Sequence, residues 1–525
     1  MKRLLFSLLA AGLVLISGTV RADDDFGFGD DTGSGSDTVS GGNGTSSGSS
    51  SFSLGPVGVK IGGKVQAELL AFTDTFETAD KLKEGQLGDV FSGALNVAAS
   101  GSAADAVINL NLAPVFDGAW TYQSASSPVT IDEAYVRAYF GPVNVEGGIR
   151  KLTWGKADSF GPLDVINPLD YTDLTKISDP MSVKIGRPLV HVSWGIGNFS
   201  KLEGMFVPWY QGHRFAMDAG DRWAPSQVTG LSGAKVSAQL RPAITEQAMR
   251  MLNLAQLMDL NNKMAGELDA YIAAAPTPQK LYSDSDPSKD RSLHYAQAGL
   301  RFTTTIASSD FGVQYYYGRL PRPALNIQVK PGLITPNDDG ATVTVDTDKI
   351  KIGLDYNDYH QIGVDYAQVL FGFNVRAEFA ANITEDLAGD RGDIYNPSLA
   401  WSLGFDRDVI AGINVNFQAT ESIRLFHDQI GKDPLVIDTE DGKDPTSTRL
   451  TLQLSRNFIR DKLQLKATGL WDIEEKGFLI MPSIAWVQND VSVELSGGIF
   501  GGDDDGELGQ YSDNHFIKAV LTYSF

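Results

Sequence analysis

The chain has 525 residues and no cysteine, which excludes a disulfide framework, a thiolate nucleophile and a cysteine zinc site. Its formal net charge of −22 at pH 7 argues against a nucleic-acid partner, because a phosphate-binding surface would be basic. Length alone permits either two or three soluble domains or one large barrel.

Residues 1–22 have the pattern of a secretory signal peptide. Lys2 and Arg3 form a charged start, and an apolar stretch follows from Leu4 to Ile16. Small residues at Val20 and Ala22 predict cleavage after Ala22. An uncleaved anchor is the alternative, which the shortness of the apolar stretch disfavours. No later apolar run reaches the length of about 18 residues that a membrane-spanning helix needs.

Residues 23–52 are rich in Gly, Ser and Asp. Such a composition buries too little apolar surface to offset chain entropy, so we expect a disordered periplasmic tail. Phe26 and Phe28 stand among acidic residues, and residues 23–31 could dock on a periplasmic partner. The alternative is a solvated linker.

From residue 53 to residue 525, apolar and polar residues alternate repeatedly, as in strands with one apolar face. The clearest segments are Ile131–Phe140, Phe373–Phe379, Ala411–Gln418, Arg449–Ser455 and Leu463–Trp471. Segments of about ten residues have the length of a tilted membrane strand. Glycine, at 55 residues, and 10% aromatic residues also suit many strands, tight turns and interfacial rings. We therefore predict an all-β protein, a transmembrane antiparallel β-barrel.

Turn signals alternate between short and long connections along the chain. Short turns are expected near residues 101, 141, 197, 308, 370, 407, 460 and 489. This alternation of short and long connections gives about 18 strands, with 16 possible. The longest connection, residues 210–291, contains a stretch at Leu231–Leu240 that resembles a strand. Counting it as a strand would place the short turn near residue 308 at the wrong end of the barrel, so we assign it to the loop.

One helix is predicted in that long loop, from about Ile244 to Ala275, where Pro276 and Pro278 would end it. Its apolar side would carry Met251, Ala255 and Met258, extended by Leu252, Leu268 and Ile272. The helix could pack on the barrel rim, or act as a lid or inward plug whose methionines contact apolar solutes.

The chain ends on an alternating strand whose apolar face carries Ile517, Ala519, Leu521, Tyr523 and Phe525. A barrel uses its last strand to remove the sheet edge, and its apolar face meets lipid. The ending resembles the C-terminal signal by which outer-membrane barrels are recognised for assembly. This resemblance implies the cell outer membrane as location and outer-membrane lipid and the barrel assembly machinery as partners.

The run from Arg150 to Tyr171 is dense in Gly, Pro and short polar residues, and should hold one fixed shape. Asp158, Asp164, Asn167 and Asp170 can bond neighbouring amides in turns. With Lys184–Pro188 and Glu203–Phe215, the run resembles a largely uncharacterised family of Gram-negative outer-membrane barrels. That family shares a WGxxD...NPxDY loop, here within residues 131–215. The resemblance implies a porin-like channel or transporter, without naming a solute.

If residues 155–179 fold into the lumen, they would constrict a pore whose wall charges set its selectivity. By alternation the wall carries Glu133, Arg137, Glu146, Arg150, Arg187, Arg376, Glu378, Arg449 and Lys466. These charges could simply pair with one another. We predict instead that Arg137, Arg150 and Arg187 on adjacent strands favour anionic solutes, or the carboxylate of an amphipathic one.

An enzyme is not expected, because the six histidines form no recognisable catalytic arrangement. We expect no cofactor and no metal site. The prediction is an outer-membrane channel for diffusion or uptake of small solutes. One alternative is a transporter of hydrophobic compounds, with the helix and Tyr315, Tyr316 and Tyr317 as its pocket. Another is a surface adhesin or structural barrel.

Overall fold

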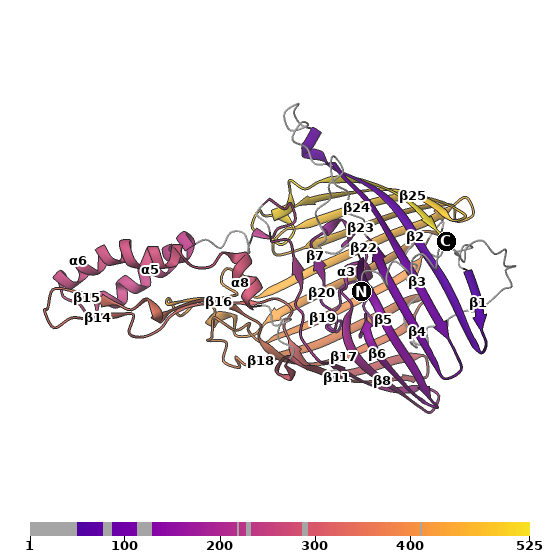
Figure 1. The fold of residues 1–525 in the computed structure, drawn as a ribbon, viewed down its shortest axis with the longest axis horizontal. Helices are drawn as coiled ribbons and strands as arrows, with labels where there is room; N and C mark the ends of the chain where they lie inside the picture. Colours follow the sequence, from indigo (N-terminus) through magenta and orange to yellow (C-terminus); the bar gives the residue numbers. More distant parts are fainter. Residues whose placement is uncertain are drawn as a thin grey trace.

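The structure, a computed structural model, describes residues 50–76, 87–112, 129–217, 220–226, 233–285, 292–409 and 412–525. In this part of the chain eighteen antiparallel strands form one closed barrel (Figure 1). Each strand pairs with the next, so the order around the ring is the sequence order. The strands are β2 (Val57–Phe72), β3 (Leu87–Ser100), β4 (Ala104–Leu112), β5 (Val129–Phe140), β6 (Val143–Arg150), β8 (Arg187–Ile196), β9 (Ser200–Val207), β11 (Gln297–Ile306), β12 (Ser309–Arg319), β17 (Asp358–Leu370), β18 (Phe373–Thr384), β19 (Ser398–Asp408), β20 (Asn414–Arg424), β22 (Thr446–Phe458), β23 (Leu463–Asp472), β24 (Phe478–Gln488), β25 (Val491–Gly501) and β26 (Phe516–Ser524).

The predicted alternation places apolar residues on the outside of the barrel. In β26, Ile517, Leu521 and Tyr523 are 51%, 49% and 51% exposed, whereas Phe516 and Lys518 are 2% and 8% exposed. Exposed large apolar residues recur in the same way on strands around the ring. A continuous apolar outer surface of this kind suits lipid rather than water. Within the described residues, no helix is both long and apolar enough to span a membrane.

The first and last strands of the ring close it. Gly63 and Phe525 exchange two backbone hydrogen bonds, of 2.7 and 2.9 Å, and the register continues to Phe72 opposite Phe516. A short strand, β1 (Ser50–Leu54), pairs with the start of β2 beyond the end of β26. Strand pairing therefore begins three residues before the predicted boundary at residue 53. The predicted leader and residues 23–49 of the predicted tail lie outside the described residues.

The connections alternate as predicted. Short turns near the predicted positions join the strands at one end of the barrel, here named the turn end, and longer segments connect them at the other, the loop end. A tight connection at residues 473–477 is the exception at the loop end. The count of eighteen strands is confirmed.

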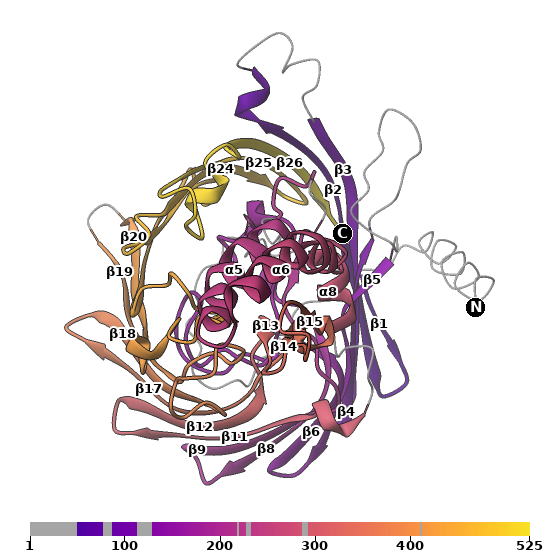
Figure 2. The same ribbon diagram turned by 90° about the vertical axis from the view of Figure 1, so that its left-hand side faces the viewer.

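A compact α/β extension, here named the arm, projects from the loop end (Figures 1 and 2). It contains α5 (Gly233–Met249), α6 (Leu254–Lys263), a π-helical turn (Met264–Leu268) and α7 (Asp269–Ala273). These helices pack on β13 (Ala324–Val329), β14 (Ile334–Pro336), β15 (Val343–Val345), β16 (Ile350–Asp355) and β21 (Val436–Ile437), and α8 (Pro278–Ser285) leads back to the barrel. Short 3-10 turns occur at Thr73–Phe76, Leu293–Tyr295, Thr347–Lys349, His427–Gln429 and Gly509–Tyr511.

The prediction of a single helix from Ile244 to Ala275 was wrong. The stretch at Leu231–Leu240 that resembled a strand leads into α5, where Val236, Leu240, Ile244 and Ala248 are buried at four-residue spacing. The helix breaks at residues 250–253, and Asn253 starts α6 with a capping box. Pro278 begins α8 rather than ending a helix.

The predicted apolar side of that helix was also wrong in part. Leu252, Leu268 and Ile272 are buried in the arm's core, but Met251 and Met258 are 55% and 65% exposed. Leu240 and Ile244 of α5 and Leu260 of α6 complete that core. The helices pack on the arm's own strands and project beyond the loop end, so they neither pack on the rim nor plug the barrel (Figure 1). The lid alternative stays a prediction.

A bulky side chain at position 63 should disturb barrel closure. A Cβ at Gly63 would lie 2.5 Å from the Ala94 carbonyl oxygen and 2.7 Å from the Phe525 ring. Gly63→Val should therefore cost about 1–3 kcal/mol and lower the yield of folded barrel, measured by circular dichroism after refolding into detergent. Gly147→Val is the matched control, because a Cβ there meets nothing within 4 Å. Equal folding yields for the two variants would contradict this account of closure.

Candidate solute pathway

The connection between β6 and β8, residues 151–186, folds into the barrel and is here named the inward loop. Its first limb, residues 155–164, lies on the wall formed by β12, β17, β18 and β20. Gln314 donates to the Leu163 carbonyl at 3.0 Å, and Gln361 donates to the Pro162 carbonyl at 2.9 Å. Gln418 accepts from the amides of Asp158 and Ser159 at 3.0 Å. Side chains of the wall thus provide hydrogen-bond partners for the backbone amides and carbonyls of the loop, as a buried segment requires.

Glu378 on β18 is the main anchor of this limb. Its carboxylate accepts from the amides of Ala157 at 2.7 Å, Leu163 at 3.3 Å and Lys156. Gly155, at φ +97°, and Gly161 both lie where a Cβ would collide with that carboxylate. Glycine is therefore required at both positions for the backbone to approach the wall.

The second limb, residues 170–183, lies on the opposite wall. It includes the 3-10 turn Leu174–Lys176 and the short helix α3 (Pro180–Val183). Lys518 of β26 donates to the Thr175 hydroxyl at 3.1 Å, and Leu174 packs among Phe72, Leu470, Leu479, Phe500 and Phe516. Counted from β2, β18 is the eleventh strand and β26 the eighteenth. The inward loop therefore crosses the lumen from wall to wall, which meets the condition on which the predicted constriction depended.

The four polar residues predicted to form turns divide into two kinds. Asn167 accepts from the Leu152 amide at 2.7 Å and donates to the carbonyls of Arg150 and Ile185. Asp170 accepts from the Thr172 amide at 3.0 Å, as a turn residue does. Asp158 and Asp164 form ion pairs instead, with Arg376 and, at 2.6 Å, with Lys184.

The predicted arginine cluster lies inside the barrel, and two of its three charges are compensated by a carboxylate. Arg137 and Arg150 both form ion pairs with Glu146, Arg137 at 2.6 Å. Arg187 is 2% exposed and donates to the carbonyls of Ile166 at 2.6 Å and Trp209 at 3.2 Å. Arg187 therefore holds the loop in place, and the anion preference assigned to the three arginines stays a prediction.

The predicted wall carboxylates also have partners. Glu133 accepts from Asn109 at 3.2 Å and from the Lys151 amide at 3.0 Å. His191 lies between Glu146 and Glu203, with a ring nitrogen 3.2 Å from each. Arg376 also pairs with Asp406 at 2.6 Å, and Arg301 with Asp365 at 2.7 Å. Many interior charges of the wall are thus paired, whereas Arg187 and Glu378 bond backbone groups.

The pocket proposed from Tyr315, Tyr316 and Tyr317 does not form. Tyr315 is on the outer surface at 42% exposed, whereas Tyr316 points inward at 1% exposed and its hydroxyl bonds Gln297. Tyr317 stands opposite Ala298 and packs on His360, on the same outward face as Tyr315. Consecutive strand residues face opposite sides of a sheet, so three neighbours cannot line one pocket.

An aromatic group at the loop end was missed by the sequence analysis. Strand β7 (Asp170–Tyr171) of the inward loop pairs in parallel with β10 (Arg214–Phe215). The Tyr171 and Phe215 rings stack with centroids 5.4 Å apart and planes 11° apart. His213 meets the Tyr171 ring edge-on at 5.2 Å, and Tyr282 meets Phe215 edge-on at 6.3 Å. These four rings form the aromatic group.

Three charged side chains, Arg322, Glu507 and Arg449, adjoin these rings and are here named the crossbar. Glu507 pairs with Arg322 at 2.6 Å and with Arg449 at 2.7 Å, and Arg449 also pairs with Asp472 at 2.6 Å. The Arg322 guanidinium lies 6.0 Å from the Tyr171 ring centroid. The proximity of Arg322 lowers the pKa of the Glu507 carboxyl far below its ordinary value. Glu507 is therefore ionised at neutral pH, and the crossbar is charged.

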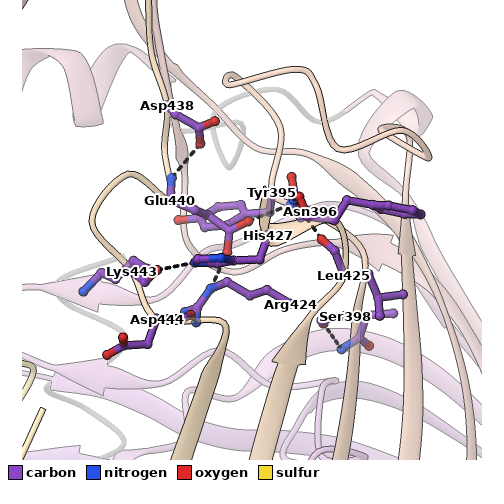
Figure 3. Close-up of polar contacts among 12 residues, drawn as sticks. Tyr395, Asn396, Ser398, Arg424, Leu425, His427, Asp438, Glu440, Lys443 and Asp444 are labelled. Atoms are coloured by element: carbon purple, nitrogen blue, oxygen red, sulfur yellow. Dashed lines mark hydrogen bonds and ion pairs between the residues drawn. The ribbon is translucent and has the colours of Figure 1, made fainter. Parts of the chain in front are cut away.

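A partly buried network of polar contacts surrounds Glu440 at the loop end (Figure 3). Glu440 accepts from the Asn396 amide and from Arg424, both at 2.8 Å, and His427 donates to the Lys443 carbonyl at 2.7 Å. Tyr395 donates to the Pro323 carbonyl at 3.2 Å, next to Arg322. These bonds tie three loop-end segments together at the base of the arm.

Comparison with known proteins gives structural likeness alone. No family model matches the chain, and no curated protein sequence matches it. Similar solved structures include OmpF of Salmonella typhi in complex with daunomycin, at 8% identity and TM-score 0.38 over 91% of this chain and 100% of that one. The BenF-like porin of Pseudomonas fluorescens Pf-5 has 9% identity and TM-score 0.43, over 89% and 98%. OccK8 (OprE) of Pseudomonas aeruginosa has 8% identity and TM-score 0.44, over 89% and 98%.

Acid should loosen the junction between the inward loop and β10. Burial lowers the pKa of His213 to about 3 from an ordinary value of 6.5, and its neutral Nδ1 accepts from the Leu169 amide at 2.8 Å. A histidine whose pKa is depressed in the folded form loses stability as pH falls from about 6.5 toward about 3, by about 1.4 kcal/mol per unit. Hydrogen exchange of residues 165–173, corrected for intrinsic rate, should rise between pH 7 and pH 5.

His213→Gln is the control for that measurement, because glutamine offers an acceptor that does not titrate in this range. Exchange in this variant should be nearly independent of pH after the same correction. The same rise in wild type and variant would assign the effect to another group.

Proposed function

We propose that this protein is a passive outer-membrane channel for the diffusion or uptake of small solutes. The inward loop carries the proposal, because it narrows a closed barrel from within and is held by the wall rather than by its own contacts. A polar lumen with a fixed constriction is what a diffusion channel needs. The paired charges of the wall leave no single sign of charge along it.

The location and partners follow from the same proposal. The predicted signal peptide, the apolar outer surface of the barrel and the predicted assembly signal at Phe525 support assembly in the outer membrane of a Gram-negative cell. Phe525, Tyr523 and Leu521 would then be the residues read by the assembly machinery. The resemblance of the Arg150–Tyr171 run to a family with a WGxxD...NPxDY loop supports the same function.

A second function is favoured by the arm. Four large apolar residues at the turn between α5 and α6 are exposed, namely Met249, Met251, Leu254 and Met258. Exposed patches of this kind are typical of binding surfaces. A surface adhesin would use this tip and would pass almost no ions, so a conductance recording separates the two functions. The alternative of a transporter for hydrophobic compounds is no longer favoured, because the tyrosine pocket on which it depended does not form.

Removal of the loop's main anchor should widen the channel. Glu378→Ala leaves three backbone amides of the inward loop without their acceptor, at a cost of about 1–3 kcal/mol for each buried donor. Single-channel conductance in planar bilayers should increase and become noisier than in the wild type. Glu246→Ala on the arm is the control, since that carboxylate is exposed and pairs only with Arg250 in the described residues. Unchanged conductance in Glu378→Ala would mean that the loop does not set the pore size.

Neutralising Glu146 should shift ion selectivity toward anions. Glu146→Gln removes the carboxylate that Arg137 and Arg150 share, so their two positive charges act on the lumen. The reversal potential in a KCl gradient should move toward that of chloride, while Glu246→Gln on the arm should leave it in place. A shift toward potassium would show that these arginines do not face the ion path.

A further inference from the structure

We propose that the crossbar and the aromatic group form a recognition site for solutes that carry an anionic group next to a planar ring. The solute's anion would replace Glu507 on Arg322, and its ring would pack against Tyr171 and Phe215. This inference rests on the proposed channel function and adds the class of solute and the place where it is recognised.

The crossbar spans the mouth of the barrel. Arg322 follows β12, the ninth strand of the ring, whereas Glu507 lies between β25 and β26, the seventeenth and eighteenth. The two partners therefore come from opposite sides of an eighteen-strand ring. Arg449 belongs to β22, the fourteenth strand, and Tyr171 to the inward loop between the fifth and sixth. A solute that enters from the loop end would meet this convergence.

The charged groups of the crossbar are accessible to solutes. The side chains of Arg322, Glu507 and Arg449 are 46%, 37% and 32% exposed, in contrast to the buried ion pairs deeper in the wall. Arg322 has a single carboxylate partner among the described residues, Glu507. A guanidinium binds a carboxylate or phosphate through two parallel N–H groups, so an incoming anion can take the place of Glu507.

Replacement of Glu507 would not leave an unpaired charge behind. Arg449 keeps its two hydrogen bonds to Asp472, of 2.6 and 3.1 Å, and can keep Glu507 as well. Arg322 gains the solute's anion in exchange. The tie across the mouth would then be broken at Arg322, so binding and opening of the path would be one event.

The rings beside Arg322 add a requirement for shape. Tyr171 and Phe215 are parallel and half-buried, and the guanidinium lies beside the Tyr171 face. A planar ring could stack on this pair while its anionic substituent reaches Arg322. A small anion without a ring would satisfy only half of the site, and a ring without charge only the other half.

The test measures binding of three probes to the full-length barrel refolded in detergent. Phenylacetate has both features, phenylacetamide has the ring alone and acetate the charge alone. Titration by saturation-transfer difference NMR, with protein-free micelles subtracted, gives the Kd of each. Phenylacetate should bind at least about tenfold more tightly than the other two, since each lacks one charged or stacking contact.

Variants of the crossbar should change that affinity in opposite directions. Arg322→Gln should weaken phenylacetate binding about tenfold, whereas Glu507→Gln should strengthen it because the internal competitor loses its charge. Tyr171→Leu should weaken phenylacetate but leave acetate unchanged. Arg250→Gln is the matched control, an exposed arginine on the arm paired with Glu246. If Arg322→Gln fails to fold, Glu507→Gln and Tyr171→Leu decide the question.

Three results would overturn the proposal: equal Kd values for phenylacetate and acetate, no gain in Glu507→Gln, or the same loss in Arg250→Gln as in Arg322→Gln. Ion conductance in planar bilayers is recorded separately in the wild type. A folded barrel that binds phenylacetate but passes no current would refute the channel and leave the recognition site standing. A conducting barrel that does not distinguish the probes would refute the recognition site and leave the channel standing.

Discussion

The pairing of β26 with β2 is the constraint on which the rest of the structure depends. A sheet whose outer face is apolar leaves no acceptor or donor outside to satisfy an open edge, so every strand must be paired. The two hydrogen bonds between Gly63 and Phe525 close the ring at its turn end. Once it is closed, the charged side chains on the inner face of the strands point into one confined lumen, where a buried charge needs a partner.

The inward loop is a consequence of that confinement. A segment inside the barrel has lost bulk water on most sides, so its amides and carbonyls require partners from the wall. Glu378, Gln314, Gln361 and Gln418 provide them from four different strands. A loop anchored at many points keeps one shape, which the proposed passive channel would need. The same contacts explain why its glycines lie against Glu378.

The sequence predicted those parts of the fold that depend on local pattern. Period-two alternation and turn spacing gave the strands, their number and the inward direction of Glu146, Arg150 and Arg376. The arm could not be predicted from local pattern, because its core is formed by residues 236–272 together with Ile327, Ile350 and Ile437, far along the chain. A periodicity read over one window could not show which face of α5 and α6 those distant strands would cover.

The crossbar could not be predicted because its partners are distant in sequence. Arg322 and Glu507 are 185 positions apart, in two loops without any motif. They meet only because closure of the ring sets their strands on opposite sides of one opening. The interior wall charges, in contrast, are compensated by neighbours one strand away, as Arg137 is by Glu146. In the proposed channel, selectivity among solutes would depend less on the sum of wall charges than on the few half-exposed ions at the mouth, where an incoming charge can compete for a partner.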